Sequence, residues 1–140
     1  IRFRMLMLSC EPSTVKVLVV DDHELTRLTL KLAIAHQENL ELVGLASNGK
    51  EAVEMAQRFH PDAVVLDLQM PVMDGWSAAA KIKDLKPETQ IIAYSSVEDP
   101  KLHDREAVAY FDAVCKKDIA TPELIKLIKE LNQQQEASRK

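Results

Sequence analysis

The chain has 140 residues, of which 46% are hydrophobic and 29% are charged, and its formal net charge is −4. This length predicts one domain, and the apolar fraction excludes a wholly disordered chain. The acidic balance argues against direct nucleic-acid binding. No apolar stretch approaches the roughly 20 residues that a membrane-spanning helix needs. The two cysteines, Cys10 and Cys115, are too few for a disulfide framework. We therefore expect a cytoplasmic protein that does not interact with membranes.

The segment that follows the first β-branched apolar run shows a clear helical period. Leu25, Leu28, Leu32 and Ala35 recur at helical spacing, which predicts a helix over residues 24–36. Short apolar runs and helical periods continue to alternate along the chain, which predicts an α/β fold with a parallel sheet covered on both faces.

Local signals mark where several of the other helices begin. Asn48 followed by Glu51 resembles a capping box, and both Asp99-Pro100 and Thr121-Pro122 are typical helix starts. The expected strands are 15–20, 40–46, 63–66, 90–94 and 112–115, and the expected later helices are 49–59, 75–85, 100–109 and 121–131. The domain is expected over residues 14–132. Residues 1–13 are expected to be an N-terminal tail upstream of or at the true start, and 133–140 a polar C-terminal tail.

Polar residues follow the strands at the edge where α/β sheets bind ligands. Three clustered carboxylates repel one another unless a cation neutralises them, and oxygen ligands favour Mg²⁺ or Mn²⁺ over Zn²⁺. A carboxylate beside such an ion can attack phosphorus, while a lysine and a hydroxyl neutralise phosphoryl oxygens. The residues in question are Asp21, Asp22, Asp67, Ser95, Ser96, Lys116 and Lys117.

Each of these residues also has a purely structural interpretation. Asp22 could cap the following helix, Ser95 could satisfy a turn, and the lysines could be solvated charges. The four histidines, His23, His36, His60 and His103, show no metal-ligand spacing and are expected to be surface or capping residues. A dehalogenase-type phosphatase would need a second aspartate where Gln69 stands. A flavin carrier would need a phosphate loop and more aromatic residues. A P-loop is excluded because Asn48-Gly49-Lys50 lacks the upstream glycine and the following hydroxyl.

Two motifs resemble the receiver domain of response regulators in two-component signalling, the CheY-like family. They are Val19-Val20-Asp21-Asp22 and the ten-residue string LDLQMPVMDG of residues 66–75, and the resemblance covers roughly residues 15–131. It implies a flavodoxin-like, doubly wound (βα)₅ fold with strand order 2-1-3-4-5. The implied site comprises Asp67 as phosphoacceptor, Asp22, Asp67 and the backbone carbonyl of Gln69 as ligands of Mg²⁺ (or Mn²⁺), Asp21 acting through water, and Ser95 and Lys117 as phosphoryl-binding switch residues.

The end of the expected fifth strand raises two points: which of two lysines points at the site, and which residue stands at the family's aromatic position. Strand alternation lets only one of Lys116 and Lys117 point at the site, and Lys117-Asp118 resembles receivers of LuxR-type regulators, so Lys117 is favoured. Family members usually carry an aromatic switch residue at the position of Val114, so the outward signal here could be weakened.

The resemblance also implies partners and an output. The chain would take a phosphoryl group from a phosphohistidine on a sensor histidine kinase or a phosphotransfer protein. It would catalyse its own phosphorylation and dephosphorylation without being an enzyme acting on other substrates. Phosphorylation would switch a surface over about residues 100–131, which could also form a phosphorylation-dependent homodimer. Two alternatives stay open: the receiver part of a DNA-binding transcription regulator, or an interaction module with weakened switching.

Overall fold

The computed structural model describes residues 14–96 and 99–139, so the expected N-terminal tail and Cys10 lie outside the described residues. Five parallel strands form one sheet in the order β2-β1-β3-β4-β5, which confirms the expected α/β topology. The strands are β1 (Val15–Val20), β2 (Leu40–Ala46), β3 (Ala63–Asp67), β4 (Gln90–Ser95) and β5 (Ala113–Lys116). The helices are α2 (Glu24–Ala35), α3 (Gly49–Phe59), α4 (Gly75–Leu85), the 3₁₀ turn η1 (Pro100–His103), α5 (Arg105–Val108) and α6 (Thr121–Arg139).

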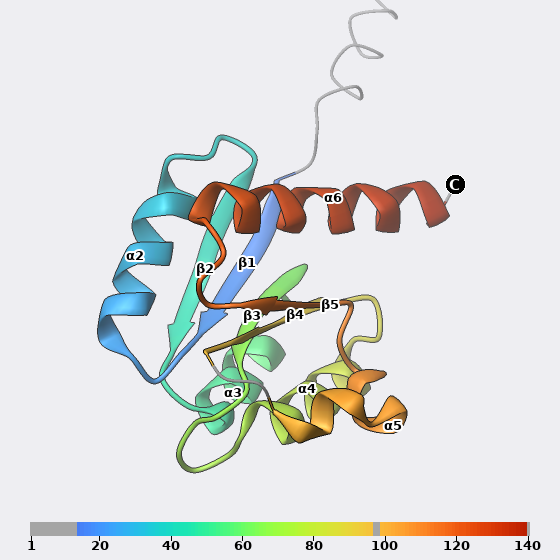
Figure 1. The fold of residues 1–140 in the computed structure, drawn as a ribbon. Coiled ribbons are helices and arrows are strands. Elements are labelled where there is room, and N and C mark those ends of the chain that lie inside the picture. The colour runs from blue at the N-terminus through green and yellow to red at the C-terminus, as the bar shows by residue number, and fades with distance from the viewer. Residues whose placement is uncertain (1–13, 97–98, 140) are drawn as a thin grey trace, which may run out of the picture.

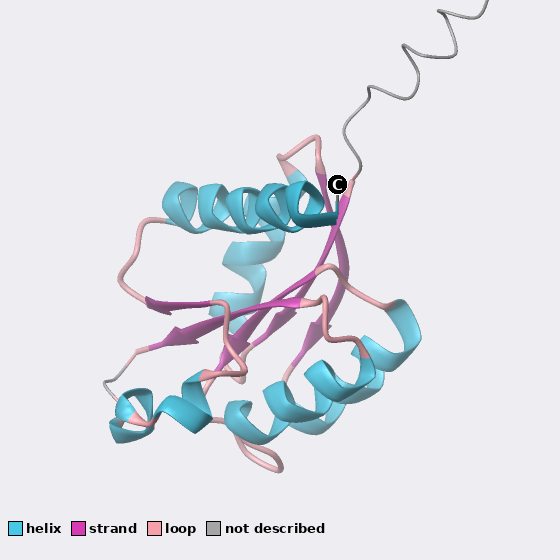
Figure 2. Cartoon of the chain, turned by 90° about the vertical axis from the view of Figure 1, so that its right-hand side faces the viewer, coloured by secondary structure: helices cyan, strands magenta, loops and turns pink. Residues whose placement is uncertain are grey.

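Helices cover both faces of the sheet (Figures 1 and 2). The helices α2 and α6 lie on one face, and α3, α4 and α5 lie on the other. Successive residues of a strand point to opposite faces. Val17 and Val19 of β1 therefore pack toward α2 and α6, whereas Leu18 and Val20 pack toward α3 and α4. This two-sided burial explains why the buried part of β1, residues 17–20, is apolar at every position rather than alternating.

The parallel arrangement brings the carboxyl ends of β1, β3, β4 and β5 to one edge of the sheet. Val20 pairs with Leu66, Asp67 pairs with Tyr94, and Ser95 is the partner of Lys116. The polar residues that follow the strands in the sequence are consequently neighbours in space.

The helical spacing of leucines correctly predicted α2, but these leucines lie on its outer face. Leu25, Leu28 and Leu32 are 75%, 48% and 54% exposed, whereas the buried residues are Leu30 and Ile34. Apolar residues recur at the same helical spacing on both faces of α2, so the spacing alone did not identify which face is buried.

Two expected elements differ in extent. The single helix expected over 100–109 is instead η1 followed by α5, because Asp104 adopts an extended backbone between them and its carboxylate accepts a hydrogen bond from the Glu106 N–H at 3.0 Å. The segment expected as a tail from 133 onward continues α6 to Arg139, which agrees with the helix propensity of its glutamine and alanine residues. No helix in the described ranges combines the length and apolarity needed to cross a membrane.

Candidate functional site

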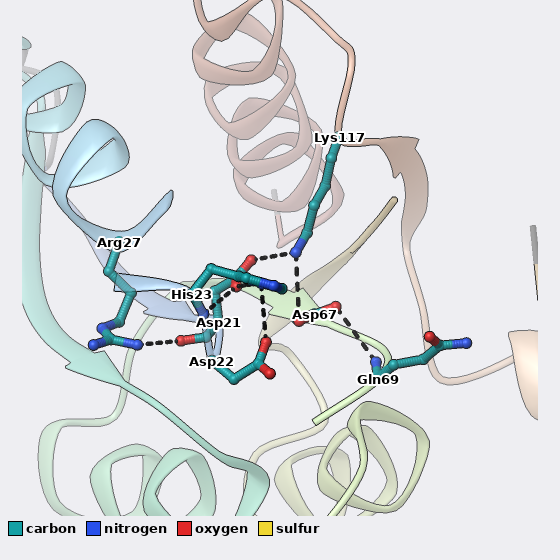
Figure 3. A network of polar contacts seen from close by, with 7 residues as sticks. All are labelled: Asp21, Asp22, His23, Arg27, Asp67, Gln69 and Lys117. Atoms are coloured by element: carbon teal, nitrogen blue, oxygen red, sulfur yellow. Dashed lines mark hydrogen bonds and ion pairs between the residues drawn. The ribbon is translucent and has the colours of Figure 1, made fainter. Parts of the chain in front are cut away.

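A lysine and two buried carboxylates meet at the carboxyl edge of the sheet (Figure 3). Asp21 follows β1 and is 1% exposed, and Asp67 ends β3 and is 4% exposed. The Nζ atom of Lys117, just beyond β5, lies 2.6 Å from Asp21 Oδ2 and 3.4 Å from Asp67 Oδ2. Three strands that are distant in sequence thus place opposite charges in one buried pocket. We call the carboxylates of Asp21, Asp22 and Asp67 the acidic pocket.

The backbone around Asp21 is held from two sides. Its N–H donates to the carbonyl of Ala46 at 3.0 Å, which ties the end of β1 to the end of β2. Its carbonyl accepts a hydrogen bond from Nη1 of Arg27, one turn into α2, at 2.7 Å. These bonds fix the direction in which the Asp21 carboxylate enters the pocket.

The structure distinguishes the two adjacent lysines. Cys115 is buried, so strand alternation turns Lys116 to solvent, where it is exposed. Lys117 donates its backbone N–H to the Ser95 carbonyl at 2.8 Å and sends its side chain into the pocket. Lys117 is therefore the lysine that reaches the carboxylates, as the sequence pattern favoured. The Cys115 thiol is free and buried.

The loop after β3 approaches the pocket closely. The Gln69 N–H donates to Asp67 Oδ1 at 3.4 Å, and the Gly75 N–H donates to the Leu68 carbonyl at 2.9 Å. A Cβ atom at position 75 would overlap the Asp67 carbonyl oxygen, so only glycine permits this approach. Val72 on the same loop has φ of 70°, an unfavourable backbone conformation for a β-branched residue.

Ser95 lies at the same edge of the sheet. It is the last residue of β4 and is buried, and the residue before it, Tyr94, pairs with Asp67 across the sheet. The expected switch hydroxyl and the expected phosphoacceptor thus stand on neighbouring strands.

The charges in the pocket perturb one another. The pKa of Asp67 is raised to about 6, chiefly by burial and secondly by the charge of Asp21, while the charge of Lys117 opposes both effects. Burial by itself lowers the pKa of Lys117, but the hydrogen bond and charge of Asp21 and the charge of Asp67 outweigh it, so this pKa is raised. One ammonium does not balance three carboxylates, and two negative charges remain to be compensated.

The residues of the pocket fit a divalent cation. Ligand atoms of Asp21, Asp22, His23 and Asp67 all lie within 4.8 Å of one another. The Oδ2 atoms of Asp21 and Asp67 are buried, and the Lys117 ammonium lies beside both of them. Carboxylate oxygen atoms are ligands that Mg²⁺ prefers.

Two sequence expectations change at the start of α2. Asp22 does not cap this helix, because the N-cap residue is His23, which itself makes no side-chain capping bond. His23 is indeed a surface residue, 65% exposed, but its ring belongs to the group around the acidic pocket. The spacing of the four histidines did not reveal it, because its companions are carboxylates. Its place directly after the Asp-Asp pair was the signal that could have found it.

The chain is similar in sequence and fold to known proteins. The family model described as the response regulator receiver domain matches residues 17–129. A protein-glutamate methylesterase/protein-glutamine glutaminase 2 from Photobacterium profundum is 45% identical over 84 residues, which are 60% of this chain and 21% of that protein. The response regulator protein VraR of Staphylococcus aureus is 37% identical over 91 residues, 64% of this chain and 44% of VraR. The chain therefore spans less than half the length of these curated relatives.

Solved structures agree with the sequence matches. The response regulator domain of Thermotoga maritima CheB superimposes with a TM-score of 0.75 at 32% identity, covering 85% of this chain and 97% of that chain. The signal receiver domain of a putative response regulator NarL from Mycobacterium tuberculosis gives a TM-score of 0.76 at 29% identity, covering 85% of this chain and 96% of that one. With the family match extending over most of its length, the chain belongs to the response regulator receiver domain family of two-component signalling.

Proposed function

We propose that this chain accepts a phosphoryl group on Asp67 from a phosphohistidine in a reaction that depends on Mg²⁺ or Mn²⁺. Receiver domains are for the most part signalling modules rather than enzymes. The observation that carries the proposal is the buried Asp67 carboxylate, which lies beside a lysine and two further carboxylates at the open edge of the sheet.

In the proposed reaction, an Asp67 oxygen attacks phosphorus as a nucleophile. The O–P bond forms as the P–N bond breaks, and the bonding pair stays with the histidine nitrogen of the donor. A bound Mg²⁺ supplies positive charge for the phosphoryl oxygens. Asp22, Asp67 and the backbone carbonyl of Gln69 would hold it directly, and Asp21 through water.

Lys117 and Ser95 are the proposed phosphoryl-binding residues. The Lys117 ammonium already lies 3.4 Å from Asp67 Oδ2, so it can neutralise charge that develops on the phosphoryl group without a large movement. Ser95 ends the neighbouring strand, and its hydroxyl is the proposed donor to the transferred group. Its movement would carry the signal to the loop that follows β4.

The proposed partners follow from this chemistry. The donor is a sensor histidine kinase or a histidine phosphotransfer protein, and the recipient of the signal is a protein or domain that recognises the surface from η1 to α6. A phosphorylation-dependent homodimer through that surface is part of the proposal. The buried free thiol of Cys115 fits a reducing compartment, so a cytoplasmic location is proposed as well.

The proposal is tested by incubating the chain with Mg²⁺ and a small phosphodonor such as phosphoramidate. Intact-mass spectrometry should find one added phosphoryl group that is stable in acid and released by base. Asp67→Asn removes the nucleophile and should not be modified. An equal adduct on Asp67→Asn, or no adduct on the wild type, would show that the assignment is wrong.

A further inference from the structure

The ring of His23 lies beside two of the carboxylates of the acidic pocket (Figure 3). Its Nδ1 atom is 3.0 Å from Asp21 Oδ1 and 3.1 Å from Asp22 Oδ1. One nitrogen atom is thus close to two carboxylates that also belong to the proposed Mg²⁺ site. The ring is 65% exposed, so burial does not account for this position.

The backbone holds His23 in this place. Its N–H donates to Asp21 Oδ1 at 2.8 Å, the same oxygen that Nδ1 contacts. The residue occupies the N-cap position of α2, yet its side chain caps nothing. The ring is therefore directed at the carboxylates rather than at the start of the helix.

We propose that the His23 imidazole is a direct ligand for late first-row divalent ions such as Ni²⁺ and Zn²⁺, and that the pocket thereby treats these ions differently from Mg²⁺. Imidazole nitrogen suits these metals, whereas Mg²⁺ takes oxygen ligands and keeps several waters. The inference rests on the proposed function only in that both place a divalent cation in the acidic pocket.

The dimensions of the group fit one ion. Metal–nitrogen and metal–oxygen bonds of about 2.0–2.2 Å put two ligands of one ion no more than roughly 4.4 Å apart. The ligand atoms of Asp21, Asp22, His23 and Asp67 lie within 4.8 Å of one another, so small side-chain rotations suffice. The Oδ2 atoms of Asp21 and Asp67 are buried, and the one Lys117 ammonium beside them leaves two of the three carboxylate charges uncompensated, which favours a cation there.

The two classes of ion should depend on His23 to different degrees. A nitrogen-accepting ion can keep Nδ1 together with the carboxylates, so it gains a ligand from this residue. Mg²⁺ draws its protein ligands from oxygen atoms alone, so it gains nothing from the ring. Removing the imidazole should therefore weaken one class of ion and spare the other.

Isothermal titration calorimetry on the full chain, freed of metal by a chelator, tests this directly and needs no phosphorylation. The dissociation constants of Mg²⁺, Ni²⁺ and Zn²⁺ are measured for the wild type, His23→Ala and His23→Phe. His36→Ala is the matched control, because His36 is an exposed histidine at the other end of the same helix, with its ring on the Leu32 carbonyl. Circular dichroism verifies that each variant is folded.

Both His23 variants should bind Ni²⁺ and Zn²⁺ at least about tenfold more weakly, with Mg²⁺ affinity within about twofold of the wild type and no change in His36→Ala. In NMR spectra of the wild type, Zn²⁺ should shift the His23 ring nitrogens. Equal losses for all three ions, or the same loss in His36→Ala, would overturn the inference. Failure of the wild type to bind Mg²⁺ would instead contradict the proposed function.

Discussion

The acidic pocket and the outermost strand of the sheet, β5, with the segment before it, are built in different ways. We call this outer strand and segment the β5 edge. In the pocket, Asp21 is enclosed by the Lys117 ammonium and by backbone bonds from Arg27 and to Ala46. At the edge, β5 has only four residues, Val114 is 44% exposed, and α5 is a single turn. Regions with few buried apolar contacts open more easily. The proposed phosphorylation site therefore lies in a strongly held region, and the part of the proposed output surface from η1 to β5 in a weakly held one.

Trp76 connects these two regions. It lies in the first turn of α4, directly after the glycine that approaches Asp67, and its indole N–H donates to Asp99 Oδ2 at 3.2 Å. Its ring packs edge-on against Phe111 at 5.0 Å and 80°. Val114, where the family resemblance led us to expect an aromatic residue, lies on the exposed side of β5. Trp76 is thus an aromatic link between the β3–α4 loop and the segment after β4.

The largest expected effect comes from removing the charge that balances the pocket. Lys117→Met leaves the Asp21 carboxylate buried without its ion pair, so the free energy of unfolding should fall by about 3 kcal/mol. Phosphorylation by a small donor should slow by roughly 100-fold. Chemical denaturation and a mass-spectrometric time course measure the two effects.

Lys116→Met is the matched control, because this neighbouring lysine is exposed and should change the unfolding free energy by less than about 0.5 kcal/mol. Similar losses in the two variants would mean that the pocket is no more tightly held than the edge.

A smaller effect should appear as a pH dependence of stability without metal. A carboxyl whose pKa is higher in the folded than in the unfolded chain stabilises the fold below its unfolded pKa and loses that contribution as the pH rises through its folded pKa. The pKa of Asp67 rises from 3.8 to about 6 on folding, so its contribution should be lost between about pH 4 and pH 6.

Asp67→Asn should therefore be more stable than the wild type by on the order of 1–3 kcal/mol above about pH 6.5, with the difference vanishing near pH 4. Urea denaturation in a chelating buffer at several pH values measures this. A difference that stays constant with pH would contradict the raised pKa.

The smallest effects on stability are expected at the β5 edge of the sheet. Trp76→Phe keeps an aromatic ring but loses the hydrogen bond to Asp99, so the unfolding free energy should fall by about 1 kcal/mol. Val114→Thr alters an exposed side chain and should change it by less than about 0.5 kcal/mol. Thermal denaturation compares the stability losses of the two variants. A larger loss for Val114→Thr than for Trp76→Phe would contradict the stabilising role of Trp76 at the β5 edge.

Much of the fold followed from local signals. The strands were predicted from their short, mainly apolar runs, and the helix starts predicted from Asn48 and Thr121-Pro122 agree with the structure. The Asn48 side chain accepts from Glu51 N–H at 2.9 Å as a capping residue should, while Glu51 reaches the Ser47 N–H at 2.7 Å. The break at Asp104 was missed because an aspartate suits both a helix surface and a new N-cap.

By itself, the sequence determined the parallel α/β arrangement and the set of polar residues at the strand ends, because hydrophobic period and strand-end position are local properties of the chain. Only the tertiary structure decided which of these residues meet. It placed the Lys117 ammonium within 3.4 Å of both Asp21 and Asp67 and turned the leucine stripe of α2 outward. Such choices depend on strand register and on distances between segments that are far apart in sequence, and no local pattern contains them.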